Sequence, residues 1–351
     1  MNSDTIGSGK CPSGTLSTMT FAELAATIVE RRELSSDEAE ALMHLLLDGQ
    51  ATPGQIGGAL LALRTKGTTT RELAAFSRAM RARMSDLTHP YEDLVDTCGT
   101  GGGSPSFNMS TAAAFIASAA GVRIAKHGNR AVTSKCGMAD VLQALGVPLS
   151  LESESTLTQL RTHGLVFLFA PNYHPAMQHV GAVRKELGVR TVFNQLGPLA
   201  NPARATRQLI GVYEYAIMRS MGEALRELGA HRALIVHGRD HLDEISPCTT
   251  TDAVRLVDGV VENTTISPFD FGRQPIDPSA LLPADDALGN AEILLEAITN
   301  ADSPRAHAVI PNAAATIWLA ELAPDLKVAA QLAEDAIRSG AARAKLEAVR
   351  V

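Results

Sequence analysis

The stretch LVDTCGTGGGSPSFNMSTAAAFIASAA, residues 94–120, decides how the chain folds. It runs from the apolar pair Leu94 and Val95, through glycines at positions 99, 101, 102 and 103, into a helical pattern over 111–120. Glycines leave the backbone open to a ligand, and the amides at a helix start favour anions. We therefore predict a strand, a phosphate-binding turn and a helix, in preference to a turn that is tight only for structural reasons.

Further apolar runs of strand length follow, and helical patterns separate them. The runs cover 122–125, 165–169, 209–213 and 233–237, and the helical patterns cover 138–145 and 217–228. Three more helical patterns, at 291–298, 312–322 and 328–337, complete the chain. Alternating strands and helices indicate an α/β fold with a mainly parallel sheet.

The preceding segment has a different character, because residues 20–85 contain only helical patterns. Thr20 with Glu23, Ser35 with Glu38, and Thr69 with Glu72 have the capping-box spacing. We predict a disordered leader over 1–19 and a helical domain over 20–88. A return segment at about 173–198 joins that domain, and residues 89–172 and 199–351 form the α/β domain. The apolar faces of these helices are expected to pack against one another within the bundle. A contact with another copy in an oligomer is the alternative.

Composition excludes several classes of protein. The 351 residues include 31 Lys plus Arg and 38 Asp plus Glu, so the net charge is −7. An acidic chain is a poor binder of nucleic acid or of a membrane surface. The 4 cysteines form no close pair, which fits a reducing cytoplasm better than a secreted disulfide scaffold.

Three more clusters carry chemistry. The stretch 126–135, KHGNRAVTSK, places cations and hydroxyls just past a strand, and together with the Gly-rich turn it indicates a substrate with two phosphate groups. Asp243 and Glu244 follow another strand and could hold Mg²⁺ beside phosphate oxygens, although adjacent acids are more often a solvated turn. Arg184, near Gly197 and Pro198, suits a carboxylate, although spacing alone leaves open a helix surface charge.

With these motifs the chain resembles the anthranilate phosphoribosyltransferase family, from about Thr20 to the C-terminus. The resemblance rests on GTGG at 99–102, NMST at 108–111, KHGNR at 126–130, YHPAM at 173–177, Arg184 with RTVFN at 190–194, GP at 197–198, and DE at 243–244. It implies a helical domain that forms a homodimer and an α/β domain related to nucleoside phosphorylases. It also implies phosphoribosyl pyrophosphate and anthranilate as substrates, with two Mg²⁺ ions per subunit.

The resemblance assigns roles residue by residue, and it assigns no catalytic nucleophile or base. Phosphoribosyl pyrophosphate would be bound by Gly99, Thr100, Gly101, Gly102, Asn108, Met109, Ser110, Thr111, Lys126, His127, Gly128, Asn129, Arg130, Ala131, Val132, Thr133 and Ser134. Anthranilate would be bound by Gly99, His127, Asn129, Arg184, Gly197 and Pro198. Magnesium would be held by Ser110, Asp243 and Glu244.

Two positions depart from the family pattern. Gly103 stands where the family usually has Asp, in a loop about one residue shorter, and Met138 replaces a small hydroxyl residue. We expect an active transferase with altered magnesium dependence. The alternatives are a paralogue acting on another aromatic amine, a pyrimidine nucleoside phosphorylase, and a catalytically silent relative that binds nucleic acid. The intact Asn129 and Arg184 favour anthranilate, and the acidic charge disfavours nucleic acid.

Overall fold

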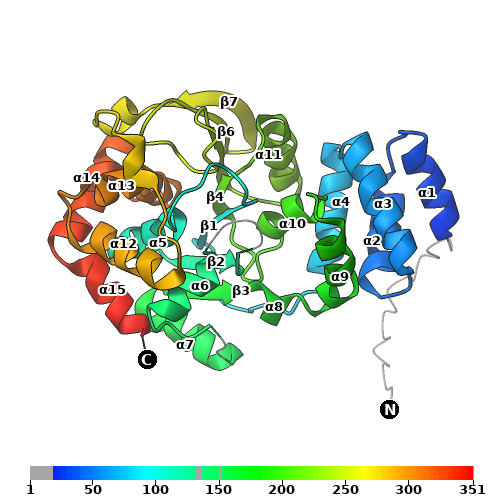
Figure 1. Cartoon of the computed structure of the whole chain (residues 1–351), viewed down its shortest axis with the longest axis horizontal. Coiled ribbons are helices and arrows are strands. Elements are labelled where there is room, and N and C mark those ends of the chain that lie inside the picture. Colours follow the sequence, from blue (N-terminus) through cyan, green and yellow to red (C-terminus); the bar gives the residue numbers. More distant parts are fainter. Residues whose placement is uncertain (1–18, 132–135, 150–151, 351) are drawn as a thin grey trace, which may run out of the picture.

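A computed structural model describes residues 19–131, 136–149 and 152–350. Most of the predicted leader, and the predicted site residues Val132, Thr133 and Ser134, lie outside this description. Figure 1 shows a small group of helices at one end of the molecule and a larger part, built around a sheet, at the other. The predicted fold class, a helical domain followed by a larger α/β domain, is confirmed.

Four helices form the small part: α1 (Phe21–Val29), α2 (Ser36–Leu47), α3 (Pro53–Lys66) and α4 (Thr70–Arg81). The three predicted capping boxes are present at the starts of α1, α2 and α4. A fourth box, between Thr52 and Gln55, starts α3 with Pro53 in its first turn. Each box satisfies orphan amides of a first helical turn, which is why the helices begin at these residues.

The larger part contains a seven-stranded sheet in the order β3-β2-β1-β4-β5-β6-β7. The strands are β1 (Val95–Gly99), β2 (Ile124–Gly128), β3 (Leu165–Phe169), β4 (Arg207–Gly211), β5 (Arg232–Gly238), β6 (Thr251–Val257) and β7 (Val260–Ile266). The first five are parallel, as predicted, and β6 and β7 are antiparallel. The last two were not predicted, because β7 is largely exposed and its sequence VVENTTI is polar.

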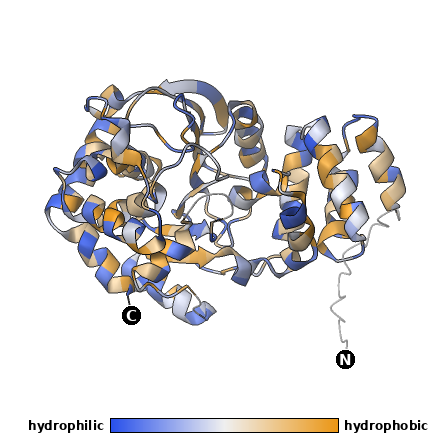
Figure 2. Ribbon diagram, in the orientation of Figure 1, coloured by the Kyte–Doolittle hydropathy of each residue, from blue (hydrophilic) through white to orange (hydrophobic). Residues whose placement is uncertain are grey.

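Most of the remaining helices cover the two faces of the sheet, and one packs against the small part. They are α5 (Met109–Ala119), α6 (Met138–Ala144), α7 (Ser153–His163), α8 (Ala170–Tyr173), α9 (Gln178–Leu187), α10 (Phe193–Leu199), α11 (Met218–Glu227), α12 (Ala287–Thr299), α13 (Pro304–Leu319), α14 (Leu326–Arg338) and α15 (Ala341–Val349). Short 3₁₀ turns lie at Pro175–Met177, Tyr215–Ile217, Pro268–Phe271 and Pro278–Leu281. Figure 2 shows apolar and polar residues mixed along these helices, as expected when one face of each is buried.

The two faces of the sheet belong to two different cores. Leu209 and Leu234 pack with α5, α6 and α12 to α15, whereas their neighbours Ile210 and Ile235 point to the opposite face. That second face shares one continuous core with α1 to α4, α9, α10 and α11. The small part is therefore joined to the sheet by apolar packing and not only by the chain.

The return segment (residues 173–198) also ties the two parts together. Its helix α9 packs against α2 and α3, and α10 packs against α4 and β1. In Figure 1, α9 lies beside the N-terminal helices although it follows β3 in the sequence. Within the described ranges, no helix combines the length and the apolar composition needed to cross a bilayer.

A buried ion pair stabilises the small part. The Glu72 carboxylate is fully buried and accepts from Lys66 Nζ at 2.7 Å and from the Leu34 and Thr69 amides at 2.9 Å. Replacing Glu72 with Gln leaves a buried ammonium without its counter-charge, which should cost about 3–5 kcal/mol. Denaturant unfolding monitored by circular dichroism measures this loss.

The matched control is Glu40→Gln. Glu40 accepts from Arg78 Nε at 2.7 Å in a partly exposed pair on the same bundle. Exposed pairs contribute about 0–1 kcal/mol, so this variant should unfold nearly as the parent does. Equal losses in the two variants would contradict the role of the buried pair.

Candidate active site

The candidate site lies where β1, β2, β4 and β5 end. Gly99, the last residue of β1, pairs in register with Gly211, the last residue of β4. We name residues 99–108 the Gly-rich loop and residues 239–246, which follow β5, the acidic loop. The Ser104 amide donates to the His241 carbonyl at 2.8 Å, and Ser104 Oγ donates to the Asp240 carbonyl at 2.8 Å. The two loops, more than a hundred residues apart, therefore form one surface at the carboxyl edge of the sheet.

The acidic loop carries two neighbouring carboxylates, Asp243 and Glu244, and Glu244 lies against the start of α5. Glu244 Oε1 accepts from the Ser110 amide at 3.2 Å. Burial and the neighbouring Asp243 raise the pKa of Glu244 to about 7, and burial raises the pKa of Asp243. A divalent cation would relieve this repulsion. No group of three or more His, Cys, Asp or Glu residues that could hold a metal occurs in the described ranges, so the remaining ligands would be water and substrate oxygens.

A second buried charge pair lies beneath the Gly-rich loop. Lys126, on β2, is buried and its Nζ donates to the Thr97 carbonyl of β1. Asp96 Oδ1 accepts from the His127 amide at 3.1 Å, and burial raises the Asp96 pKa while lowering the Lys126 pKa. The opposite charges of Asp96 and Lys126 counter both shifts, so the pair balances itself inside the sheet.

The predicted residues at the start of α5 fall into two groups. Ser110 and Asn108 are half-buried, and Asn108 Nδ2 donates to the Cys136 carbonyl at 3.2 Å. The Asn108 Oδ1 atom is buried without a hydrogen-bond partner among the described residues. The Met109 and Thr111 side chains are buried, and Met109 packs in the core around α13. The Ser110 side chain is thus a half-buried polar group of this turn, whereas the Asn108 amide group is turned inwards, with its Oδ1 atom buried.

The residues after β2 face α6. Gly128 lies under Met138, and a Cβ at position 128 would come within 2.5 Å of the Met138 sulfur. Arg130 is exposed and donates to Asp140 at 2.8 Å and to Gln143 at 3.0 Å. Asn129 accepts from the Arg130 amide at 2.7 Å. The Arg130 charge is therefore already paired in this structure, and the Ala131 amide donates to Asp140 at 3.0 Å.

The other predicted residues gather around α10. His127 contacts the Gly197 backbone, and its ring lies 5.0 Å from that of His174. Burial lowers the pKa of His127 to about 3 and that of His174 to about 4, so both imidazoles are neutral at pH 7. The Arg184 guanidinium lies 5.2 Å from the centre of the Phe193 ring.

Arg184 is the charged group of this region without a counter-charge. Burial lowers its pKa, and no carboxylate lies within ion-pair distance in the described part of the chain. Arg184 is half-buried. A partly desolvated guanidinium without an anion gains from a carboxylate, which it can hold with two hydrogen bonds. This half of the site therefore suits an aromatic acid, since neutral rings and backbone surround one cation.

Sequence patterns missed a residue that joins the two halves. Arg190 Nη2 donates to the Gly102 carbonyl at 2.5 Å, and its guanidinium lies 4.2 Å from the centre of the Tyr213 ring. The Tyr213 amide in turn donates to Thr100 Oγ1 at 3.1 Å. Arg190 belongs to a quoted motif, but nothing in the sequence indicates a contact with a carbonyl 88 residues away.

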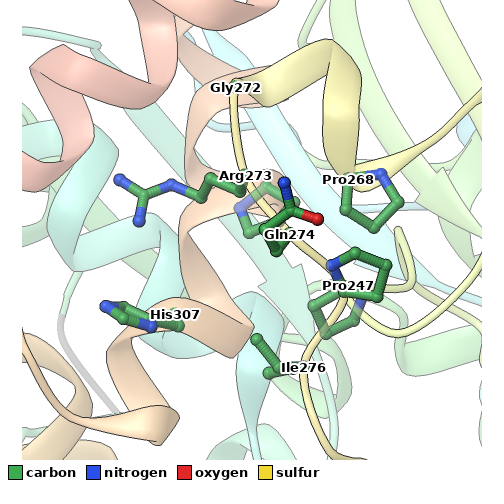
Figure 3. Close-up of a pocket in the computed structure, with 9 residues that line it drawn as sticks. Pro247, Pro268, Gly272, Arg273, Gln274, Ile276 and His307 are labelled. Carbon is green, nitrogen blue, oxygen red and sulfur yellow. The ribbon is translucent and has the colours of Figure 1, made fainter.

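A separate cavity of about 280 Å³ lies away from these residues. Figure 3 shows its lining, which is Pro247, Pro268, Gly272, Arg273, Gln274, Pro275, Ile276, His307 and Pro311. Its Arg273 is already paired with Glu334 at 2.5 Å. None of the predicted site residues lines this cavity, so the chemistry of the chain is concentrated at the strand ends.

Comparison with known families agrees with this architecture. A model described as the helical bundle domain of a glycosyl transferase family matches residues 22–84. A second model, described as the a/b domain of a glycosyl transferase family, matches residues 91–343. Together the two matches span the described helical bundle and nearly all of the sheet-containing part.

Individual relatives are similar over almost their whole length. Anthranilate phosphoribosyltransferase from Myxococcus xanthus is 44% identical over 333 residues, covering 94% of this chain and 98% of that protein. The protein of the same name from Rubrobacter xylanophilus is 47% identical over 316 residues, covering 90% and 92%.

Solved structures agree as well. The crystal structure of anthranilate phosphoribosyltransferase from Thermus thermophilus matches with a TM-score of 0.87 at 38% identity, covering 93% of this chain and 99% of that one. The Saccharomyces cerevisiae enzyme, solved in complex with PRPP and Mg, matches with a TM-score of 0.85 at 27% identity, covering 96% and 98%. Because relatives at 44% and 47% identity cover nine-tenths or more of its length, the chain belongs to the anthranilate phosphoribosyltransferase family.

Proposed function

We propose that the chain transfers the phosphoribosyl group of phosphoribosyl pyrophosphate to the amine of anthranilate, giving N-(5-phosphoribosyl)anthranilate and pyrophosphate. The observation that carries this proposal is the Arg184 guanidinium, which lies against the Phe193 ring with no carboxylate in ion-pair distance among the described residues. The Gly-rich loop and the two carboxylates of the acidic loop form the other part of the candidate site. An anionic aromatic acceptor and a phosphorylated donor are the two ligands that these halves suit. A yeast relative was solved in complex with 4-fluoroanthranilate, which supports the acceptor.

The donor half is assigned to the Gly-rich loop and its surroundings. The backbone amides of Gly99 to Gly102 and the Ser110 hydroxyl would receive phosphate oxygens, because bare amides favour anions. Lys126 is buried beneath the loop, so its charge would act on the donor from below without direct contact. The remaining donor-side assignments are Thr100, Asn108, Met109, Thr111, His127, Gly128, Asn129, Arg130 and Ala131, with Val132, Thr133 and Ser134 outside the described residues. Because Met109 and Thr111 are buried, they would shape the turn and not touch the donor with their side chains.

The acceptor half is assigned to Gly99, His127, Asn129, Arg184, Gly197 and Pro198. Arg184 would bind the anthranilate carboxylate, and the neutral His127 would line the ring beside Gly197. A neutral imidazole adds no second positive charge that would attract phosphate to this half. The distribution of charge would therefore separate the acceptor from the donor.

Magnesium fits the donor half. The yeast relative was solved with PRPP and Mg, and here Asp243, Glu244 and Ser110 offer oxygen atoms beside the Gly-rich loop. We assign two Mg²⁺ ions per subunit to these residues. When bound, the ions would neutralise the charge that develops on the departing pyrophosphate.

The chemistry then needs no protein nucleophile. The bond between the ribose C1 carbon and the pyrophosphate oxygen breaks, and pyrophosphate leaves with the electron pair. The lone pair of the anthranilate nitrogen forms the new bond to C1, and the nitrogen gives up one proton to water. The chain contributes by holding the amine in line with C1 through Arg184 and by stabilising the leaving group with the Gly-rich amides.

The wider assignments follow from the same architecture. We propose that residues 20–88 and the return segment act as one helical domain, with residues 89–172 and 199–351 as the other. We also propose a homodimer formed through the helical domain, on which Val29 and Leu61 are exposed at 70% and 44%. Cytoplasmic location suits an enzyme of amino-acid biosynthesis whose cysteines include no disulfide among those described.

Arg184→Ala should raise the KM for anthranilate about tenfold to a hundredfold, because a charge-assisted hydrogen bond contributes about 1.5–3 kcal/mol. The KM for phosphoribosyl pyrophosphate should stay within about twofold. Steady-state kinetics with each substrate varied in turn measures both values. The control is Lys185→Ala, which removes the neighbouring exposed cation of α9. A parallel rise in both KM values would place Arg184 on the donor side instead.

Asp243→Asn and Glu244→Gln should each lower kcat by about a hundredfold or more, because the leaving group loses its charge stabilisation. Thermal melting should change little, since the amides keep the shape of the carboxylates. Glu262→Gln, at an exposed carboxylate on β7, is the control and should keep parental turnover. Unchanged magnesium-dependent turnover in both site variants would refute the assignment.

Acid should destabilise the fold through His127 and His174. Their folded pKa values of about 3 and 4 lie below the unfolded value of about 6.5, so the unfolded chain binds more protons below pH 6.5. The stabilisation is complete above pH 6.5 and declines as the pH falls towards the folded values. Each of the two histidines should lower the free energy of unfolding at pH 5.5 by about 1.4 kcal/mol relative to pH 7.5.

Urea unfolding at the two pH values tests this for His174→Gln. On acidification the variant should lose less unfolding free energy than the parent, and the difference should equal the contribution of one histidine. His231→Gln, at an exposed histidine, is the control and should lose as much unfolding free energy on acidification as the parent. If His174→Gln has the same acid sensitivity as the parent, His174 is not the buried neutral group that we describe.

A further inference from the structure

We propose that Gly103 and Gly211 form a slot without side chains that positions the Asp243 backbone, and with it the metal-binding carboxylates. This inference rests on the proposed function, because it assigns both glycines as positioning residues for the phosphoribosyl donor. Neither glycine belongs to the sites assigned above. Gly211 ends β4, and Gly103 lies in the middle of the Gly-rich loop.

Both glycines contact the same residue at distances that exclude a side chain. A Cβ at position 211 would lie 1.7 Å from the Asp243 carbonyl oxygen. A Cβ at position 103 would lie 2.5 Å from the Asp243 amide nitrogen and 2.8 Å from the His241 carbonyl oxygen. Close-packed protein interiors tolerate no such overlap. Because these atoms belong to the backbone, they cannot rotate away as a flexible side chain could.

Space, and not backbone conformation, is the reason for glycine at these two positions. Gly101 and Gly102 have φ values of +67° and +90°, which favour glycine in their own right. Gly103 and Gly211 are not among the positive-φ residues, so an L-residue could adopt their backbone angles. Contact with the acidic loop excludes a larger residue at both positions, through Asp243 at each and through the His241 carbonyl oxygen at position 103 as well.

The acidic loop cannot retreat from the slot, because it is held from behind. The Ile245 amide donates to Asn312 Oδ1 at 3.0 Å, and Asn312 Nδ2 donates to the Ile245 carbonyl at 3.1 Å. Asn312 is fully buried in α13. In front, the Thr100 amide donates to the Gly211 carbonyl at 2.8 Å. Asp243 and Glu244 therefore lie between a fixed helix and the backbone of two glycines.

The Gly-rich loop is the part that must yield to a side chain at position 103. Its contacts with the acidic loop are the Ser104 hydrogen bonds to His241 and Asp240. A Cβ at position 103 would push the loop outwards, break the bond from the Ser104 amide and separate the phosphate-binding amides from the carboxylates. A misplacement of about 1 Å can cost on the order of a hundredfold in rate. Gly103 thus allows the Gly-rich loop to contact the backbone of the acidic loop directly. A carboxylate side chain at the same position would prevent this contact.

The test uses Gly103→Ala and Gly103→Asp in the full-length protein, with Pro105→Ala as the control in the same loop. Pro105 is exposed, and it is not among the individual residues assigned to the donor, the acceptor or magnesium. Hydrogen exchange of the ligand-free protein reports on the seating, and kinetics report on its consequence. We expect the Ser104 amide to exchange about tenfold faster in both Gly103 variants and unchanged in the control.

In kinetics, both Gly103 variants should raise the KM for phosphoribosyl pyrophosphate and the half-saturating Mg²⁺ concentration by about tenfold. The KM for anthranilate should stay within about twofold, which a general loss of structure would not produce. Similar effects of Ala and Asp would show that volume matters and not charge. Gly211→Ala should lower kcat by about a hundredfold. If this variant does not fold, the Gly103 variants still test the proposed slot.

Parental exchange at Ser104 together with parental magnesium dependence in Gly103→Ala would overturn the proposal. So would a large effect of Asp with none of Ala, since charge would then be the cause. If the parent itself showed no turnover with the two substrates, the proposed function would fail. The exchange experiment would still test the slot, because it needs no substrate.

Discussion

The approach of three backbone segments at one point controls the rest of the site. The end of β1, the end of β4 and the acidic loop meet with no side chain between them, since Gly99 pairs with Gly211 and Gly211 contacts Asp243. Parallel strands bring their carboxyl ends to one edge, and the loops that follow must share that space. Their contact fixes the carboxylates relative to the amides that would receive phosphate. A larger residue at any of these positions would widen the site at its centre.

The charges near that point are arranged in compensating groups. Asp96 and Lys126 balance each other within the sheet. Burial raises the pKa of both Asp243 and Glu244, and the Asp243 charge raises that of Glu244 further, so a cation would be favoured there. Beyond them the environment changes, because His127 and His174 are neutral and Arg184 is the unpaired charge. In the proposed function, one half of this surface would bind a metal-bound phosphate and the other an organic carboxylate. This separation of charge would let the site bind each of two anionic substrates in its own half.

The return segment links this chemistry to the helical part. It begins after β3, packs α9 on α2 and α3, and supplies both Arg184 and Arg190. Arg190 reaches the Gly-rich loop, whereas Arg184 lies over α10. One apolar core runs from the N-terminal helices to one face of the sheet. Movement of those helices would therefore change the positions of both arginines. The helical part is therefore a structural element of the site, and its stability bears on the proposed activity.

The sequence by itself determined the local structure and the chemical character of the chain. The capping boxes at Thr20, Ser35 and Thr69, the parallel strands and the Gly-rich turn between β1 and α5 follow from spacing, because they depend on neighbouring residues. The family resemblance added the pairing of Arg184 with an acceptor. Only the tertiary structure decided the contacts across long sequence distances, namely Arg190 with Gly102 and Gly211 with Asp243. The antiparallel β6 and β7 were also not predicted. The sequence of β7 is largely polar, and its pairing with β6 is what makes it a strand. In the sequence Gly103 is only one more glycine in a run, and its need for space arises from a loop 140 residues further along.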